Sequence, residues 1–373
     1  MKKTLLRYGL LASVLAVNGI GSANAGWLDN PFGSVASVLA STPSANTAAA
    51  ATAIDPATSA ATQYPVILVN GLFGSDDYLK GPLFQGFPYW YGIVEDLRRH
   101  GAKVYVASVR TIDDEAARGQ DLLDFINKVA PGQKVNLIGH SQGGFTVRYV
   151  AQIAPDRVAS VTTIGTPHWG APLADVINGA IGVVDNLGFG AAVRAAVGPL
   201  AAVLGLVIQG NPNQDAFGAL GVLDSAGAAA FNQKYSTAGL GDPKSCTSGA
   251  VTQTIDGNVQ QLYSWSGSAF RGPLPHDASL NTVFGVPLDT ATVLDGTTLG
   301  LATVGLPTVA FGLGDNDGMV PVCRSKFGQV IGTGFKWNHL DEVNQIAGVL
   351  GGNAEDPVAV IRTHVERLKN AKL

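Results

Sequence analysis

The stretch Val135–Gly143, with the sequence VNLIGHSQG, decides the fold of this chain of 373 residues. Its first four residues are typical of a β-strand, and the residues after Gly143 place apolar side chains on one face at helical spacing. Between the two lies Ser141, in the pattern Gly-x-Ser-x-Gly. Glycines on both sides allow a sharp turn from strand to helix that projects the hydroxyl above the edge of a sheet. The stretch therefore predicts a nucleophilic serine on an α/β fold.

Other short runs of β-forming residues occur along the chain at helix-sized intervals. Apolar runs separated in this way are typical of a parallel sheet that is buried on both faces. We expect a mostly parallel central sheet flanked by helices, with the functional site at the carboxyl ends of its strands. The expected strands are Tyr64–Val69, Lys103–Ala107, Val135–Ile138, Ala159–Ile164 and Pro307–Phe311.

The composition is that of a globular protein. Hydrophobic residues make up 46% of the chain and charged residues 14%, which excludes an intrinsically disordered protein. The 24 lysines and arginines and 28 aspartates and glutamates give a net charge of -4. Because there is no basic excess, we expect no binding to nucleic acid.

Residues 1–25 have the form of a secretory signal peptide. Lys2, Lys3 and Arg7 are followed by an apolar run and by the small residues of Ala23–Ala25. The apolar run is too short and interrupted for a membrane anchor. We expect a mature chain without a transmembrane segment, exported through the periplasm to the extracellular medium.

Two later segments also stand out by composition. Residues 26–62 are rich in Ala, Ser and Thr and almost uncharged, which predicts a linker or tail before a folded domain at 63–373. Residues 172–210 are dense in Ala, Val, Leu and Gly. This second segment has two interpretations, which are buried core helices or a mobile amphipathic lid over an apolar cleft.

The chain has two cysteines, Cys246 and Cys323. In an exported protein an even number of cysteines favours a disulfide. Two buried free thiols are the alternative.

A nucleophilic serine requires a base, and the base requires an orienting acid. His339 follows the acid-rich loop Gly314–Gly318, which gives the chain order serine, acid, histidine that this architecture requires. Within the loop we favour Asp317 over Asp315, because the glycine after it allows a turn that aims the carboxylate. The backbone N–H of Gln142 lies at a helix N-terminus, which favours an oxyanion.

The remaining histidines have other expected roles. His140, inside the serine motif, and His168, after the next strand, are expected to pack around the site or to support it. His364 lies on a helical pattern near the C-terminus and is expected on a solvated face. His100 and His276 belong to no motif.

From about Tyr64 to the C-terminus the chain resembles the secreted bacterial triacylglycerol lipases of the Burkholderia and Pseudomonas type. The motifs that carry the resemblance are Tyr64–Val69, Gly139–Gly144, Thr163–His168, Asn316–Gly318 and Trp337–Glu342. The resemblance implies an α/β-hydrolase fold for residues 63–373, in which we expect residues of about 172–222 to form a helical lid. It also implies a lipase-specific folding chaperone as a partner.

The resemblance assigns the catalytic machinery residue by residue. It implies a triad of Ser141 as nucleophile, Asp317 as acid and His339 as base. It places the oxyanion hole at the backbone N–H groups of Leu72 and Gln142. Cys246 and Cys323 stand in the motifs that carry the disulfide of the family.

The resemblance also implies one structural calcium ion near the catalytic histidine. Asp295 and Asp341 fall at the positions of the carboxylate ligands, and Gln345 and Val349 at those of the carbonyl donors. Oxygen donors suit this hard cation, although by residue type alone the two aspartates would be ordinary surface acids. Because Asp341 lies close after His339, the ion would fix the loop that positions the base.

Three features depart from the family pattern. Asn70 replaces the histidine of the usual His-Gly-Leu motif before the oxyanion position. The loop Phe73–Pro88 is longer and more aromatic than usual, so the preferred acyl length is expected to differ. Trp169 stands at a position that is often basic.

The expected function is hydrolysis of carboxylic esters of acylglycerols at an oil–water interface, through an acyl-enzyme and without an organic cofactor. One alternative keeps the triad and changes the substrate, as in a polyester depolymerase or an acyltransferase. An alternative of another class is a non-catalytic lipid-binding protein on the same fold, against which the three triad residues argue.

Overall fold

The computed structural model describes residues 58–72, 74, 78–81, 84–110, 114–186, 221–272, 282–283, 286–287, 297–298, 301, 304–305, 308–309, 312–351 and 354–373. The predicted signal peptide, most of the predicted tail, residues 187–220 of the predicted lid, and Asp295 lie outside these ranges.

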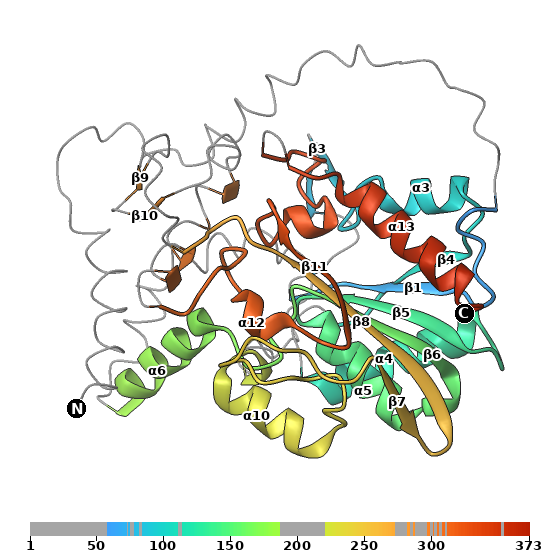
Figure 1. Cartoon of the computed structure of the whole chain (residues 1–373), viewed down its shortest axis with the longest axis horizontal. Helices are drawn as coiled ribbons and strands as arrows, with labels where there is room; N and C mark the ends of the chain where they lie inside the picture. The colour runs from blue at the N-terminus through green and yellow to red at the C-terminus, as the bar shows by residue number, and fades with distance from the viewer. Residues whose placement is uncertain are drawn as a thin grey trace, which may run out of the picture.

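A central sheet of seven strands forms the middle layer (Figure 1). Its strands follow the order β11-β8-β6-β5-β1-β4, with every neighbouring pair parallel, and β7 pairs antiparallel with β8. The predicted mostly parallel sheet is therefore confirmed. The strands are β1 (Val66–Val69), β4 (Val104–Ala107), β5 (Val135–His140), β6 (Val158–Ile164), β7 (Thr252–Ile255), β8 (Asn258–Gly267) and β11 (Gln329–Phe335).

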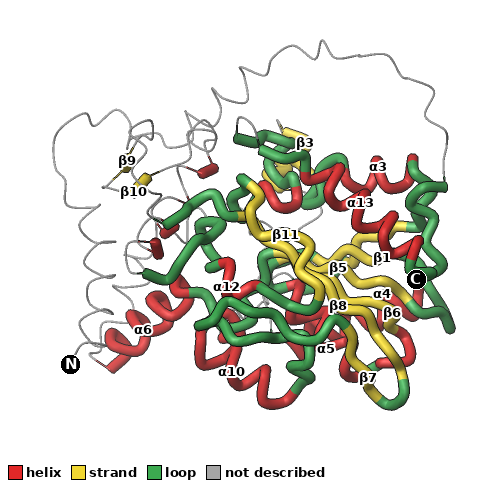
Figure 2. The backbone as a smooth tube through the Cα atoms, viewed as in Figure 1, coloured by secondary structure: helices red, strands yellow, loops and turns green. Residues whose placement is uncertain are grey.

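Apolar side chains of β1 point alternately to the two faces of the sheet, so both faces need to be covered by helices. Val66 and Leu68 pack in one hydrophobic cluster, and Ile67 and Val69 pack in another. The first cluster includes residues of α3 (Ile93–Arg99) and α13 (Pro357–Asn370). The second includes residues of α4 (Glu115–Val129) and α5 (Gly143–Ile153). Figure 2 shows the two helix layers on opposite sides of the strands.

Smaller elements surround this core. The helices are α6 (Pro172–Asn186), α10 (Ser225–Lys234) and α12 (Val322–Ser325), with 3-10 turns η1 (Pro155–Arg157) and η2 (Asp341–Val343). Two short hairpins pair β2 (Tyr78–Gly81) with β3 (Phe84–Phe87), and β9 (Thr282–Val283) with β10 (Val286–Pro287). A search of the described residues finds no helix with the length and hydropathy needed to span a bilayer.

A strand was expected at Pro307–Phe311, and the structure describes two residues of this segment. At both of them the expectation is wrong. Thr308 and Val309 are helical, and the Thr308 hydroxyl donates to the carbonyl of Val304 one helical turn earlier at 2.8 Å. A short apolar run cannot distinguish a buried strand from a turn of buried helix by periodicity alone. The strands that complete this side of the sheet are β8 and β11.

Cys246 and Cys323 form the predicted disulfide, with an S–S distance of 1.97 Å and a sequence separation of 77. Cys323 lies in α12, directly after the loop that carries Asp317. The Lys326 ammonium donates to the carbonyl of Cys246 at 2.6 Å, beside the same junction. The disulfide therefore fixes the segment that follows the expected acid to a distant part of the chain.

Replacing both cysteines by serine is expected to destabilise the fold. In the chain-entropy model, opening a loop that spans 77 positions lowers the free energy of unfolding by about 4 kcal/mol. Urea denaturation of the double variant against the oxidised wild type measures this difference. A change of less than about 1 kcal/mol would mean that the loop closure adds little.

Candidate active site

Ser141 lies at the turn between β5 and α5, as the sequence predicts. Its φ angle is +55°, a left-handed conformation that is rare for residues other than glycine. Its backbone N–H donates to the carbonyl of Ile164 at the end of β6 at 2.8 Å, and its own carbonyl accepts from Gly144 at 3.0 Å. These bonds hold the strained turn at the carboxyl edge of the sheet.

The glycines of the motif are required by close packing. A Cβ atom at Gly139 would lie 2.3 Å from the carbonyl oxygen of Gly143. A Cβ atom at Gly143 would lie 2.5 Å from the carbonyl oxygen of Val69, at the end of β1. Both distances are shorter than any normal contact, so the turn can form only with glycine at these two positions.

His339 and Asp317 form a buried pair. Nδ1 of His339 lies 2.7 Å from Oδ2 of Asp317, and the backbone N–H of His339 donates to the Asp317 carbonyl at 2.8 Å. The other carboxylate oxygen of Asp317 accepts from the backbone N–H groups of Met319 and Val320, at 2.8 and 2.6 Å. Asp315 is held elsewhere, because its Oδ1 accepts from Gly272 at 2.7 Å. The structure thus brings together the favoured aspartate and the histidine.

The imidazole of His339 lies beside the serine turn. Its ring centroid is 4.6 Å from that of His140, the residue directly before Ser141. Both rings are buried. The aspartate–histidine pair therefore lies beside the residue that precedes Ser141, at the carboxyl end of β5.

Glu342, His140 and Tyr89 form further contacts around His339, and the sequence did not predict these contacts. Oε2 of Glu342 lies 3.1 Å from Nε2 of His140 and 3.7 Å from Nδ1 of His339. Oε1 of Glu342 accepts from the backbone N–H of Gly267 at 2.5 Å. The hydroxyl of Tyr89 lies 2.5 Å from Nδ1 of His140. These groups come together only in the tertiary fold. His140 was expected to support the site, and it does so.

Burial dominates the electrostatics of the cluster. It raises the pKa of Glu342 well above its ordinary value, and the neighbouring negative charge of Asp317 adds to the effect. Burial also lowers the pKa of His140 well below its ordinary value, which keeps this imidazole neutral. His140 is therefore a fixed neutral hydrogen-bonding group at working pH.

Leu72 and Gln142, the expected oxyanion residues, lie after the ends of β1 and β5. These two strands are adjacent and parallel, so their carboxyl ends meet. Asn70, the departure from the family pattern, uses its side-chain oxygen to accept from the indole Nε1 of Trp90 at 2.7 Å. Its carbonyl accepts from Nη2 of Arg118 at 2.7 Å.

The side chain of Gln142 is held by a buried polar network. Its Nε2 donates to Oε1 of Glu115 at 2.8 Å, and the hydroxyl of Thr146 donates to Oε2 of Glu115 at 2.7 Å. Nε of Arg118 donates to that hydroxyl at 3.1 Å. Burial raises the pKa of Glu115 to about 7, against the opposing effect of Arg118. A carboxyl group that titrates near neutrality therefore contacts an expected oxyanion residue.

Three of the four predicted calcium ligands are described. Asp341 begins η2 and is buried, and its Oδ2 accepts from the backbone N–H of Asn338 at 2.9 Å. The Gln345 carbonyl accepts from Ala347 at 3.1 Å and keeps a second lone pair, and Val349 follows in the same turn. The carboxylate of Asp341 and the carbonyl groups of this turn are oxygen donors, which fit a hard cation.

A second group could also hold a metal ion. His140, His339 and Glu342 each offer one ligand atom, and these atoms lie within 4.8 Å of one another. This set was not predicted as a metal site. Its nitrogen donors suit transition metals rather than calcium, and its atoms already take part in the hydrogen bonds described above.

The expectation of a solvated face for His364 is wrong. His364 is buried beneath the sheet, where its Nε2 lies 2.9 Å from the hydroxyl of Thr162 and its ring contacts Trp265. His168 is also buried, with Nε2 3.1 Å from the hydroxyl of Thr163. Helical periodicity identified the helix of His364 but assigned this polar residue to the wrong face, because its polar atoms are satisfied inside the protein.

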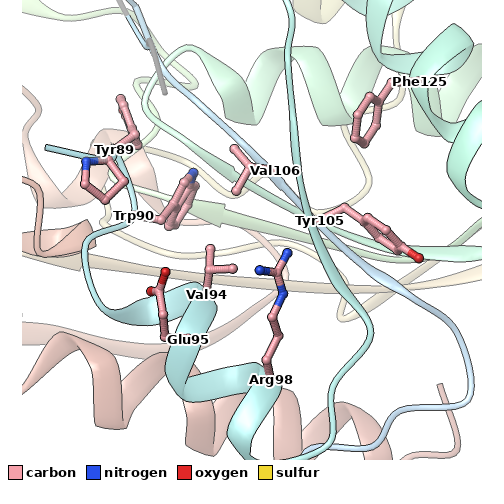
Figure 3. A pocket seen from close by; sticks show the side chains of 9 residues that line it. Tyr89, Trp90, Val94, Glu95, Arg98, Tyr105, Val106 and Phe125 are labelled. Carbon is pink, nitrogen blue, oxygen red and sulfur yellow. The ribbon is translucent and has the colours of Figure 1, made fainter. Parts of the chain in front are cut away.

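A surface pocket of about 360 Å³ is lined by Tyr89 and by residues of α3, β4 and α4. Figure 3 shows Tyr89, Trp90 and Val106 on its wall, with Arg98 extending beside it. A second pocket of about 370 Å³ is lined in part by Trp169, at the position that departs from the family pattern. Neither pocket includes Ser141 or His339 among its lining residues.

Known proteins are similar to this chain over most of its length. The model of the alpha/beta hydrolase fold matches residues 64–181. A triacylglycerol lipase of Burkholderia plantarii is 47% identical and aligns with 90% of this chain and 95% of its own. The chain belongs to the bacterial triacylglycerol lipase family. A triacylglycerol lipase of Pseudarthrobacter phenanthrenivorans is 48% identical over 84% of this chain and 98% of its own, and one of Vibrio cholerae is 37% identical over 84% and 89%.

Solved structures agree with this family at the level of the fold. The lipase of Staphylococcus hyicus superposes with a TM-score of 0.53 at 16% identity, and covers 83% of this chain and 97% of its own. A metagenomic carboxyl esterase superposes with a TM-score of 0.50 at 15% identity, and covers 83% and 76%. The predicted α/β-hydrolase fold and the resemblance to lipases are both confirmed.

The raised pKa of Glu115 predicts a pH dependence of stability. A carboxyl with a folded pKa of about 7 and an ordinary value of 4.5 favours the folded state fully below pH 4.5, and this contribution is lost as the pH rises through 7. Between about pH 4.5 and pH 8, the free energy of unfolding of the wild type should fall by up to about 3 kcal/mol relative to that of Glu115→Gln.

Urea denaturation of both proteins across this range measures the difference. Glu95→Gln, at an exposed glutamate of α3, is the matched control and should keep a constant offset from the wild type. A constant offset for Glu115→Gln as well would contradict the raised pKa.

Proposed function

We propose that this chain hydrolyses carboxylic esters of acylglycerols through a triad of Ser141, Asp317 and His339. The observation that carries the proposal is the buried contact of 2.7 Å between Nδ1 of His339 and Oδ2 of Asp317, beside the strained turn of Ser141. The curated relatives that match most of the chain are named triacylglycerol lipases. A lipid-binding protein without catalysis would have no use for a buried aspartate–histidine pair next to a strained serine.

In this mechanism Asp317 accepts a hydrogen bond from Nδ1–H of His339, which leaves the lone pair on Nε2 to serve as the base. His339 takes the proton of the Ser141 hydroxyl as its oxygen attacks the ester carbonyl carbon. The protonated imidazole then donates this proton to the departing alcohol, which leaves an acyl-enzyme. Water, activated by the same imidazole, hydrolyses the acyl-enzyme and regenerates the serine.

The backbone N–H groups of Leu72 and Gln142 stabilise the oxyanion in this proposal. Gln142 is the N-cap residue of α5, where the partial positive charge of the helix N-terminus favours negative charge on the substrate. Leu72 follows β1, next to β5, so that the two groups approach the same point above the sheet.

We extend the proposal to the remaining predicted features of the enzyme. Residues 1–25 direct export, 26–62 form a tail, and the catalytic domain is 63–373 with a lid at about 172–222. The enzyme acts on lipid at an oil–water interface outside the cell and folds with a dedicated chaperone. The identity of nearly half of all aligned positions with lipases over almost their entire length supports this assignment.

Ser141→Ala tests the nucleophile. The variant should lose ester hydrolysis by at least about 10³-fold, because the other groups alone retain only weak catalysis. It should also lose covalent labelling by a fluorophosphonate probe. The matched control is Ser245→Ala, at an exposed serine in the loop after α10, which should keep wild-type labelling and rate. Labelling of Ser141→Ala at the wild-type level would exclude this nucleophile.

We also propose that Asp295, Asp341, Gln345 and Val349 hold one calcium ion. When bound, the ion would supply structural charge neutralisation beside the loop of His339. It would take no part in bond making. The buried carboxylate of Asp341 and the oxygen donors of the turn after it support this proposal.

Removing calcium is therefore expected to lower the Tm. A free calcium concentration of about 100 times Kd stabilises a folded protein by about 2.7 kcal/mol, and magnesium should not replace it. Differential scanning calorimetry in calcium and in EGTA measures the shift. Asp341→Asn should abolish the shift, whereas Asp156→Asn, at an exposed aspartate, should preserve it. A Tm of the wild type that is independent of calcium would contradict the proposal.

A further inference from the structure

The hydroxyl of Tyr89 lies between two separate turns of the backbone. The N–H of Gly71 donates to Oη of Tyr89 at 3.0 Å, and Oη lies 2.5 Å from Nδ1 of His140. Tyr89 is only 3% exposed, and both hydrogen bonds are buried. A single buried hydroxyl thus connects the segment after β1 to the last residue of β5.

These two segments are adjacent to the atoms that stabilise the oxyanion. Gly71 directly precedes Leu72, and His140 directly precedes Ser141. The backbone of Gly71 is tightly confined, because a Cβ atom there would lie 2.7 Å from Cβ of Ser141 and 2.8 Å from Oη of Tyr89. Any movement of this segment would change the position of the Leu72 N–H relative to the serine.

Trp90, the residue after Tyr89, bonds to the same segment at Asn70, the residue before Gly71. Its indole N–H donates to Oδ1 of Asn70 at 2.7 Å. Tyr89 and Trp90 therefore provide two consecutive side-chain hydrogen bonds to the consecutive residues Asn70 and Gly71. Tyr89 and Trp90 also line the surface pocket beside α3 that Figure 3 shows.

The direction of each hydrogen bond follows from the donors. Because the Gly71 N–H already donates to the Tyr89 oxygen, we assign the phenol proton to the bond with Nδ1 of His140. Nε2 of His140 then carries the imidazole proton and donates to Glu342 at 3.1 Å. Burial raises the pKa of Tyr89 and lowers that of His140, so both groups stay neutral.

We propose that Tyr89 is a positioning residue of the oxyanion hole, which fixes the N–H of Leu72 relative to Ser141 by bonding both Gly71 and His140. The inference rests on the proposed function, because it assigns the oxyanion role to Leu72. Tyr89 acts through Gly71 and has no direct part in bond making.

The test compares Tyr89→Phe with the wild type on two substrates. One is a soluble short-chain aryl ester, and the other is its thionoester, in which sulfur replaces the carbonyl oxygen. An oxyanion hole is built for oxygen, and the larger sulfur is a weak acceptor, so a well-formed hole favours the ester strongly. The ratio of kcat/KM for the two substrates reports the hole itself and does not depend on how much enzyme is folded.

Tyr89→Phe should lower kcat for the ester about tenfold with KM almost unchanged, which is less than the 10²–10³-fold loss on deleting a donor outright. The rate on the thionoester should change less than about twofold, so the ester preference should fall at least about fivefold. Tyr263→Phe is the matched control, because it removes the hydroxyl of another buried tyrosine, on β8 against His364. It should leave the ester preference unchanged.

An unchanged ester preference in Tyr89→Phe would overturn the inference, whatever the loss of rate, because a structural role lowers both rates equally. A failure of the proposed function gives a different result, in which the wild type hydrolyses neither substrate and is not labelled by the fluorophosphonate. If Tyr89→Phe folds poorly, the ratio still decides, because it is measured on the folded fraction alone.

Discussion

The site depends on the close approach of two backbone turns, one after β1 and one after β5. The two strands are parallel neighbours, so both turns leave the sheet at the same edge. Gly143 packs against the carbonyl of Val69, and Gly71 packs against Ser141, at distances that no side chain could tolerate. Backbone N–H groups from two distant parts of the sequence can therefore converge above one serine. Ser141 has a left-handed conformation at this contact, and its bonds to Ile164 and Gly144 stabilise that conformation.

A second constraint is the cost of burying charge beside this contact. Asp317 offsets its burial with two backbone N–H donors and the imidazole of His339. Glu342 has a backbone donor from Gly267 and a contact with His140, and its pKa rises because burial and the neighbouring Asp317 disfavour a second negative charge. These contacts come from β8, from the loop before α12 and from the loop after β11. The acid and the base are thus held by the fold as a whole.

The sequence predicts the parts of the site that are local or carried by a motif. The turn of Ser141 follows from a strand, two glycines and a helix in succession, and the choice of Asp317 follows from the glycine after it. The contacts of Tyr89 and Glu342 could not be predicted in this way, because each joins residues far apart in the chain. The strand expected at Pro307–Phe311 and the face assigned to His364 were wrong for a related reason. Local patterns do not reveal which polar groups find partners in the interior.

The replacement of histidine by Asn70 shows how these constraints combine. Its side chain accepts from Trp90, from the layer of α3, and its carbonyl accepts from Arg118, from the layer of α4. Residue 70 is therefore held from both faces of the sheet, and its amide oxygen faces the indole of Trp90. With this side chain so engaged, the next residue is oriented by its own backbone bond to Tyr89. The departure from the family pattern thus leaves the geometry after β1 dependent on the Tyr89–Trp90 pair.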